Sequence, residues 1–133
     1  IRGWLVKDRK KNQVTVSREP AEGGAPIETA YEPLASNGAM TLLKVELVTG
    51  KTHQIRSHLA GTGHPLAGDG KYGDAAFNRY FRERYRLNSQ FLHSWKIEFP
   101  AMDAPFDALS RRTVTAEPPE LFRKILQAEG LEY

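Results

Sequence analysis

The chain has 133 residues, of which 40% are hydrophobic and 26% are charged, so it can form one globular domain or part of one. Its formal net charge of +3 permits nucleic-acid binding without demonstrating it. The absence of cysteine excludes disulfides and thiolate zinc sites. No apolar run approaches the roughly 18 residues of a membrane span. We therefore expect a cytoplasmic protein with no membrane partner.

The first third of the chain predicts two β-hairpins. Residues 4–6 and 14–16 are apolar segments separated by a polar stretch, which is typical of a hairpin. Residues 27–34 and 40–48 alternate apolar and polar side chains, as half-buried strands do. The Asn-Gly turn signal at 37–38 predicts that these two strands pair.

Helices are expected later in the chain. Residues 52–60 predict a short helix with Thr52 as its N-cap. A second helix follows Asp74, a candidate cap, and residues 91–99 predict the last strand. The proline pair at 118–119 opens a terminal helix. Because the strands precede the helices, we expect an α+β fold with a mixed, mostly antiparallel sheet and two or three helices.

Two familiar kinds of site do not fit the polar segment that begins at residue 49. Residues 50–52 read Gly-Lys-Thr, but a phosphate-binding P-loop also needs a glycine at position 45, where the chain has Val45. His53 and His58 are five residues apart and Gln54 follows the first of them. A zinc-protease helix needs a spacing of four and a glutamate, so no metal site is expected.

The strand that ends near residue 49 delivers polar side chains to the start of a helix. They are Lys51, Thr52, His53, Gln54 and Arg56. Unpaired N–H groups and the helix dipole favour an anion at such a position. An RNA phosphate would fit, and we predict Lys51, Thr52, His53 and Gln54 as RNA-binding residues and favour a functional role for Arg56. For Lys51 alone, an ordinary solvated lysine is the favoured alternative.

Residues 71–86 interleave basic and aromatic side chains, and we predict RNA contacts for Lys71, Arg79 and Arg82. The aromatic residues have helical spacing and equally fit an inward-facing stripe. They are Phe77, Phe81 and Tyr85.

Three further polar residues favour structural roles. Asp69 lies between two glycines, which favours a turn-forming aspartate. His58 is interpreted as a hydrogen-bonded helix residue. His64 precedes a proline, so its backbone is expected to be extended and to shape the loop.

The ordered polar and glycine positions of residues 49–73 resemble the signature of RluA-type RNA pseudouridine synthases. The matching positions are Thr49, Gly50, Lys51, Thr52, His53, Gln54, Ile55, Arg56, His58, Gly63, His64, Pro65, Gly68, Asp69, Tyr72 and Gly73. Segments 24–31, 90–94 and 115–122 also resemble family segments. The likeness therefore covers nearly the whole chain.

The resemblance implies that uridine in structured RNA is isomerised to pseudouridine without cofactor or metal. The expected RNA is large-subunit ribosomal RNA, with transfer RNA as the alternative. In the family, the arginine matching Arg56 pairs with the catalytic aspartate, and the leucine matching Leu92 packs near the target uracil. These two residues are the expected catalytic-site residues, both in supporting roles.

One departure from the family pattern is decisive for the domain interpretation. The family's nucleophilic aspartate lies in a His-Arg-Leu-Asp segment, which this sequence does not contain. Residues 1–133 are therefore expected to be the C-terminal portion of a catalytic domain whose N-terminal half is missing, and to be inactive alone. The alternative is a non-catalytic RNA-binding module derived from the same fold. The sequence preceding Ile1 would separate the two.

Overall fold

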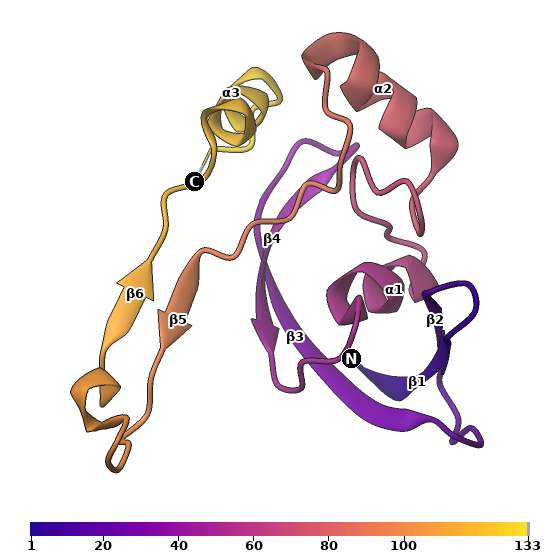
Figure 1. The fold of residues 1–133 in the computed structure, drawn as a ribbon. Coiled ribbons are helices and arrows are strands. Elements are labelled where there is room, and N and C mark those ends of the chain that lie inside the picture. Colours follow the sequence, from indigo (N-terminus) through magenta and orange to yellow (C-terminus); the bar gives the residue numbers. More distant parts are fainter. Residues whose placement is uncertain (133) are drawn as a thin grey trace.

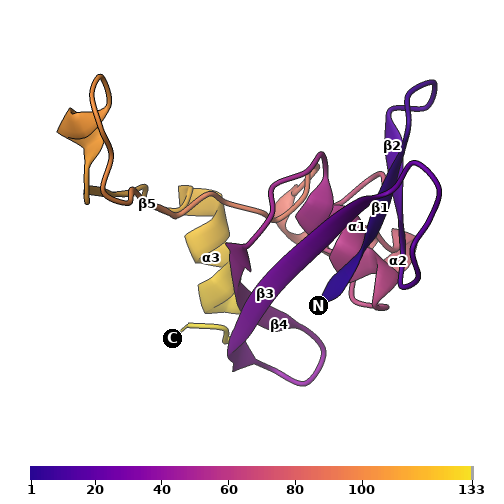
Figure 2. The ribbon, with the colours of Figure 1, turned by 90° about the horizontal axis from the view of Figure 1, so that it is seen from below.

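The computed structural model describes residues 1–132 and contains a four-stranded sheet, a two-stranded ribbon and three α-helices (Figures 1 and 2). The strands are β1 (Arg2–Asp8), β2 (Gln13–Ser17), β3 (Ala25–Ser36), β4 (Thr41–Leu47), β5 (Lys96–Glu98) and β6 (Thr113–Thr115). The helices are α1 (Gln54–Gly61), α2 (Ala75–Tyr85) and α3 (Glu120–Ala128), and a 3₁₀ turn, η1, spans Asp107–Leu109. All strand pairs are antiparallel, which confirms the predicted α+β class.

The larger sheet has the strand order β2-β1-β3-β4 and is built from the two predicted hairpins. In the second hairpin, the Asn37 side chain accepts hydrogen bonds from the N–H groups of Ala39 and Met40, and Gly38 has a φ of 89° that favours glycine. The register of β3 on β4 shifts after Pro33. Proline has no N–H to donate to the ladder, which accounts for a shift at this position.

Two apolar clusters stabilise the fold. The first lies on the sheet beside α1 and consists of Leu5, Val14 and Ile27, whose exposed fractions are between 2% and 6%. The second joins α2 to α3 through Phe81 and Ile125, both nearly inaccessible. The first cluster therefore packs the sheet, and the second packs α2 against α3 with Met40 of the second hairpin beside them.

Two predicted elements were partly wrong. Thr52 does not cap α1, because the helix begins at Gln54 and His53, the residue before it, adopts a left-handed conformation with a φ of 51°. The predicted strand 91–99 is reduced to β5. Its first residues leave the strand path because the Phe91 N–H donates to the Ala67 carbonyl and the Phe91 ring stacks on Phe122 at 4.1 Å.

The prediction for α2 was accurate, and the one for α3 was close. Asp74 caps α2 by accepting a hydrogen bond from the Phe77 N–H at 2.7 Å, and the helix ends at Tyr85 as expected. α3 begins directly after Pro119. β6 was missed, because a three-residue strand is too short to give an alternating pattern.

Residues 95–115, which we call the arm, extend away from the body of the molecule (Figures 1 and 2). The arm contains β5, η1 and β6, and α3 then returns to pack against the body. Within residues 1–132, no helix has the length and apolar character needed to cross a membrane.

Candidate active site

Part of the polar signature serves to attach α1 to the sheet. The buried Gln54 amide donates to the Glu28 carbonyl at 2.9 Å and to the Thr29 hydroxyl at 3.0 Å. Its oxygen accepts from the Thr49 hydroxyl at 2.9 Å and from the Lys51 N–H at 3.0 Å. Gln54 was predicted to contact RNA, but it is only 2% exposed and its side chain is occupied within the protein. It therefore organises the strand-to-helix junction.

His58 also has a structural position. Its Nδ1 lies 2.9 Å from the Thr29 hydroxyl, which accepts from Gln54 and so has its own proton available to donate to the ring. Burial lowers the pKa of His58 below its usual value. The structural role predicted for this histidine is consistent with a buried, neutral ring.

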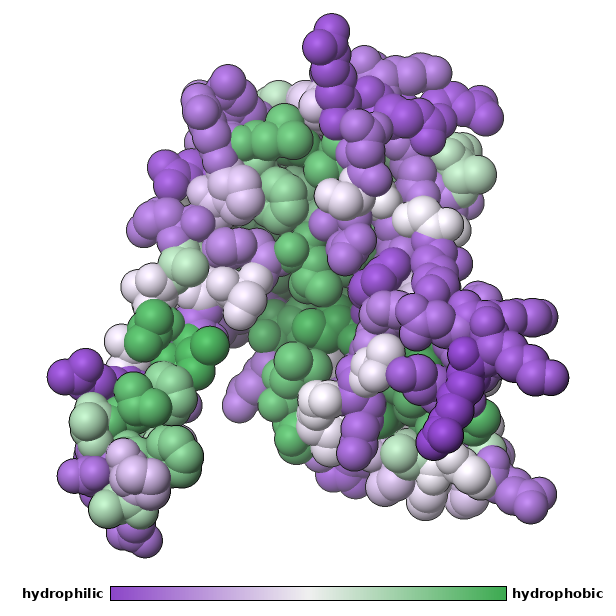
Figure 3. Space-filling view, in the orientation of Figure 1, coloured by the Kyte–Doolittle hydropathy of each residue, from purple (hydrophilic) through white to green (hydrophobic). Residues whose placement is uncertain are grey.

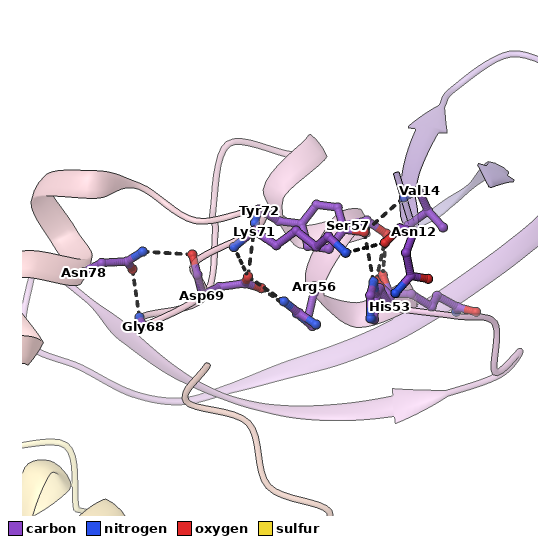
Figure 4. A network of polar contacts seen from close by, with 11 residues as sticks. Asn12, Val14, His53, Arg56, Ser57, Gly68, Asp69, Lys71, Tyr72 and Asn78 are labelled. Atoms are coloured by element: carbon purple, nitrogen blue, oxygen red, sulfur yellow. Dashed lines mark hydrogen bonds and ion pairs between the residues drawn. The ribbon is translucent and has the colours of Figure 1, made fainter. Parts of the chain in front are cut away.

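The central feature is a fork-shaped ion pair between Arg56 of α1 and Asp69 of the following loop (Figure 4). Nε donates to Oδ2 and Nη2 donates to Oδ1, each at 2.8 Å. Asp69 Oδ1 also accepts from the backbone N–H groups of Lys71 and Tyr72 at 3.0 and 3.1 Å. These backbone contacts are the turn-forming role that the sequence favoured, whereas the ion pair was missed.

Electrostatics keep both partners charged. Burial alone would raise the pKa of Asp69, but hydrogen bonds from Arg56 and from two backbone N–H groups outweigh it and lower the pKa to about 2. The hydrogen bonds to Asp69 in turn raise the pKa of Arg56. The Asp69 side chain is 0% exposed and that of Arg56 is 15% exposed, so only the arginine reaches solvent.

Tyr72 supports the arginine from a second direction. The centre of its ring lies 5.2 Å from Arg56 Cζ, a cation–π contact. Its hydroxyl accepts from the Val14 N–H at 3.0 Å and lies 3.0 Å from His53 Nδ1. Burial, with the charges of Arg56 and Lys71, lowers the pKa of His53. The lowered pKa favours the neutral form of His53 beside the fixed guanidinium.

The loop that holds Asp69 depends on a tight backbone. Gly68 has a φ of 77°, and a Cβ there would overlap the Ser89 carbonyl oxygen. Asn78 of α2 accepts from the Gly68 N–H and donates to the Asp69 carbonyl, both at 2.8 Å. The glycine and the asparagine together fix the position of the Asp69 carboxylate.

Leu92, predicted to lie near the target uracil, is 38% exposed and lines an apolar groove of about 760 Å³. Ile55, the neighbour of Arg56 on α1, lines the same groove. Apolar side chains occupy the middle of this face of the molecule (Figure 3). The groove therefore lies next to the helix that presents Arg56.

The other predicted RNA-binding residues fall into two groups. Lys51, Thr52 and Lys71 are exposed close to the Arg56 site, and Lys71 Nζ donates to the Asn12 carbonyl. Arg79 and Arg82 lie on the exposed face of α2, and no hydrogen bond within residues 1–132 joins them to this site. Among the same residues, no group of three or more His, Cys, Asp or Glu side chains could hold a metal ion.

Comparison with known proteins identifies the family. A family model described as RNA pseudouridylate synthase matches residues 1–61. Together with the relatives below, this match shows that the chain belongs to the RluA-type pseudouridine synthase family, as its sequence signature predicted.

Several relatives with assigned names are similar to this chain. The ribosomal large subunit pseudouridine synthase C of Vibrio vulnificus is 34% identical over 89% of this chain and 36% of its own length. That of Haemophilus influenzae is 44% identical over 74% of this chain and 30% of its own length. The synthase D of Nitrosomonas europaea is 45% identical over 58% of this chain and 23% of its own length. The chain thus spans roughly a third or less of the relatives it matches.

Proposed function

We propose that this chain belongs to a cytoplasmic RNA pseudouridine synthase that acts on large-subunit ribosomal RNA. It would form the part of the active site that contains Arg56. The observation that carries the proposal is the fixed guanidinium of Arg56. Its Nε and one N–H of Nη2 are used by Asp69, and no hydrogen bond within residues 1–132 uses Nη1. An arginine has five N–H donors in a rigid fork, so its outer edge remains available to a second anion.

That second anion, in our proposal, is the carboxylate of the catalytic aspartate, supplied by a segment outside these 133 residues. The aspartates described here are poorly suited to the role. Asp69 is buried in its ion pair, Asp74 caps α2, and Asp8 accepts from the backbone of its own turn. Asp103 and Asp107 lie in the arm, which extends away from the body that carries Arg56 (Figure 1). A positive charge beside the incoming carboxylate would keep it ionised, because an opposite charge lowers a carboxyl pKa.

The reaction breaks the N-glycosidic bond between C1′ and N1 of uridine, turns the base, and forms a bond between C1′ and C5. The proton that leaves C5 is balanced by one taken up at N1, so the atoms balance without oxidant or reductant. The uracil must leave its stack to react. Leu92, which lines the apolar groove, would pack against the displaced base.

The test is pseudouridine formation by the complete protein on unmodified large-subunit ribosomal RNA. We expect one or a few uridines to be converted, and the isolated 133-residue chain to convert none. Conversion by that chain alone would contradict the proposal that the catalytic carboxylate is supplied from outside these 133 residues. Binding of the RNA by the complete protein without conversion would instead favour a non-catalytic RNA-binding module.

A further inference from the structure

The tip of the β1–β2 hairpin is a compact cluster of positive charge. Residues 7–11 contain four basic side chains and one acidic side chain, a formal charge of +3 that equals the net charge of the whole chain. All five residues are exposed. The basic side chains are Lys7, Arg9, Lys10 and Lys11, and we call residues 7–11 the basic tip.

The backbone of the basic tip has a defined shape. Asp8 Oδ1 accepts hydrogen bonds from the N–H groups of Lys10 and Lys11 at 3.0 and 3.2 Å, which closes the turn. The only carboxylate of the basic tip is thereby directed at its own backbone. The basic side chains extend from this turn without an ion pair to another part of residues 1–132.

The basic tip is also joined to the Arg56 site. Lys71 Nζ donates to the carbonyl of Asn12, the residue that follows the tip, and the Val14 N–H donates to the Tyr72 hydroxyl (Figure 4). The Tyr72 ring in turn contacts Arg56. The charge of Lys7 is among those that lower the pKa of His53, after burial and the charges of Arg56 and Lys71. Hairpin, loop and α1 thus form one connected unit.

We propose that the basic tip, with Lys71, binds the phosphate backbone of the RNA that flanks the uridine at Arg56. The inference rests on the proposed function and adds a binding surface to it. Exposed lysine and arginine side chains bind phosphates through charge, without reading sequence. Residues 7–12 are all polar, so they offer neither the apolar anchor of a typical protein interface nor that of a membrane-surface helix. Hydrophilic side chains gather over this hairpin at the edge of the molecule (Figure 3).

The experiment compares two double variants of the complete protein that each remove two positive charges. Lys10→Gln/Lys11→Gln lowers the formal charge of the basic tip from +3 to +1 and leaves the backbone bonds to Asp8 in place. Arg123→Gln/Lys124→Gln is the matched control on α3, which lies at the other end of the molecule from the hairpin (Figures 1 and 2). The control residues form only exposed ion pairs, at 3.4 Å, and such pairs contribute little to stability.

For each protein, the dissociation constant for a ribosomal RNA segment is measured at several salt concentrations, beside the single-turnover rate at saturating RNA. We expect the tip variant to bind about tenfold more weakly near 0.1 M salt. Its salt slope should fall by about 1.4, since each phosphate contact to single-stranded RNA contributes about 0.7. The saturated rate and the control should stay within twofold of wild type.

Two results would overturn the proposal. The first is a tip variant that binds RNA with the affinity and salt slope of the control, which is also the result expected if the tip serves an acidic protein partner. The second is a variant with normal affinity and a reduced saturated rate. The RNA dissociation constant is measured without turnover, so it tests the basic tip even if the complete protein forms no pseudouridine. The absence of pseudouridine would refute the proposed function alone.

Discussion

The Arg56 site and the arm use their polar and apolar residues in opposite ways. Around Arg56, polar side chains are buried and paired, and no buried side-chain nitrogen or oxygen within residues 1–132 lacks a hydrogen-bond partner. In the arm, apolar side chains are exposed: 51% for Ile97, 57% for Phe106 and 52% for Val114. The polar signature is therefore part of the framework, whereas the apolar residues of the arm form no core of their own.

This difference shows what holds each region in place. Asp69 and Gln54 stabilise the position of α1 through directed hydrogen bonds, and the Tyr72 hydroxyl lies within hydrogen-bond distance of His53, the residue before the helix. Losing one partner of such a bond leaves a buried group unpaired. The arm has two three-residue strands, and an isolated two-stranded hairpin is at best marginally stable. Substitutions should therefore affect stability strongly at the first region and weakly at the second.

The largest effect on stability is expected for Asp69→Ala. It leaves Arg56 without its partner and two N–H groups without their acceptor, and breaking a buried ion pair costs about 3–5 kcal/mol. Urea unfolding of the complete protein measures the change. Asp107→Ala, at an exposed position in the arm, is the matched control and should change stability by less than about 0.5 kcal/mol. Equal effects at the two positions would remove the distinction between the regions.

Shortening an apolar side chain should also destabilise the protein more in the sheet than in the arm, with a somewhat smaller loss of stability than Asp69→Ala. Ile27→Ala, at a side chain 2% exposed, should destabilise the protein by about 3 kcal/mol, because it leaves a cavity in the first cluster. Ile97→Ala in β5 should cost less than about 1 kcal/mol. Thermal unfolding of both variants is the measurement. A loss at Ile97 as large as that at Ile27 would mean that the arm is packed against something in the complete protein.

The ion pair predicts a loss of stability in acid. The folded pKa of Asp69 is about 2, below the unfolded value of about 3.9, so its contribution is present above the unfolded value and is lost as the pH falls through the folded value. The difference corresponds to about 2–3 kcal/mol, lost progressively between about pH 5 and pH 1. Wild type should therefore show a steeper pH dependence of unfolding than Asp69→Asn. Parallel curves for the two proteins would contradict the lowered pKa.

The smallest effect is expected for Tyr72→Phe. The ring stays beside Arg56, but the buried Val14 N–H loses its acceptor, which costs about 1–2 kcal/mol. Tyr31→Phe, in a half-exposed ring of β3, is the control and should be nearly neutral. Denaturant midpoints resolve this difference. A neutral Tyr72→Phe would show that the hydroxyl does not connect the hairpin to the Arg56 site.

Local pattern was sufficient to predict much of the fold. Two apolar segments around a polar stretch gave the first hairpin, alternation of side chains and an Asn-Gly turn gave the second, and Asp74 gave the start of α2. The failures lie where distant contacts decide the backbone. Residues 91–95 read as a strand, but Phe91 is held by Ala67 and by the Phe122 ring. Such a contact leaves no trace in the local sequence.

The sequence predicted which residues belong to the candidate site, but not which of them form the ion pair. Arg56 and Leu92 came from the family resemblance, and the structure places them on α1 and in the groove beside it. The partner of Arg56 is 13 residues away across a glycine-rich loop, a separation with no helical or strand periodicity. The two glycines that flank Asp69 signalled a tight turn, but its direction toward α1 depends on Asn78 and on the positive φ of Gly68.

The most direct test concerns the role of Arg56 in the complete protein. Single-turnover rate and RNA dissociation constant are measured at several salt concentrations for Arg56→Ala, Lys51→Ala and Arg82→Ala, with Arg56→Lys as the variant that keeps a positive charge near Asp69. We expect Arg56→Ala to lower the saturated rate by about 10²–10³-fold with little loss of affinity. Lys51→Ala and Arg82→Ala should weaken binding and flatten its salt dependence at an unchanged rate. If Arg56→Ala binds poorly but reacts at the normal rate once saturated, then Arg56 is a ligand of the RNA backbone and not part of the reacting site.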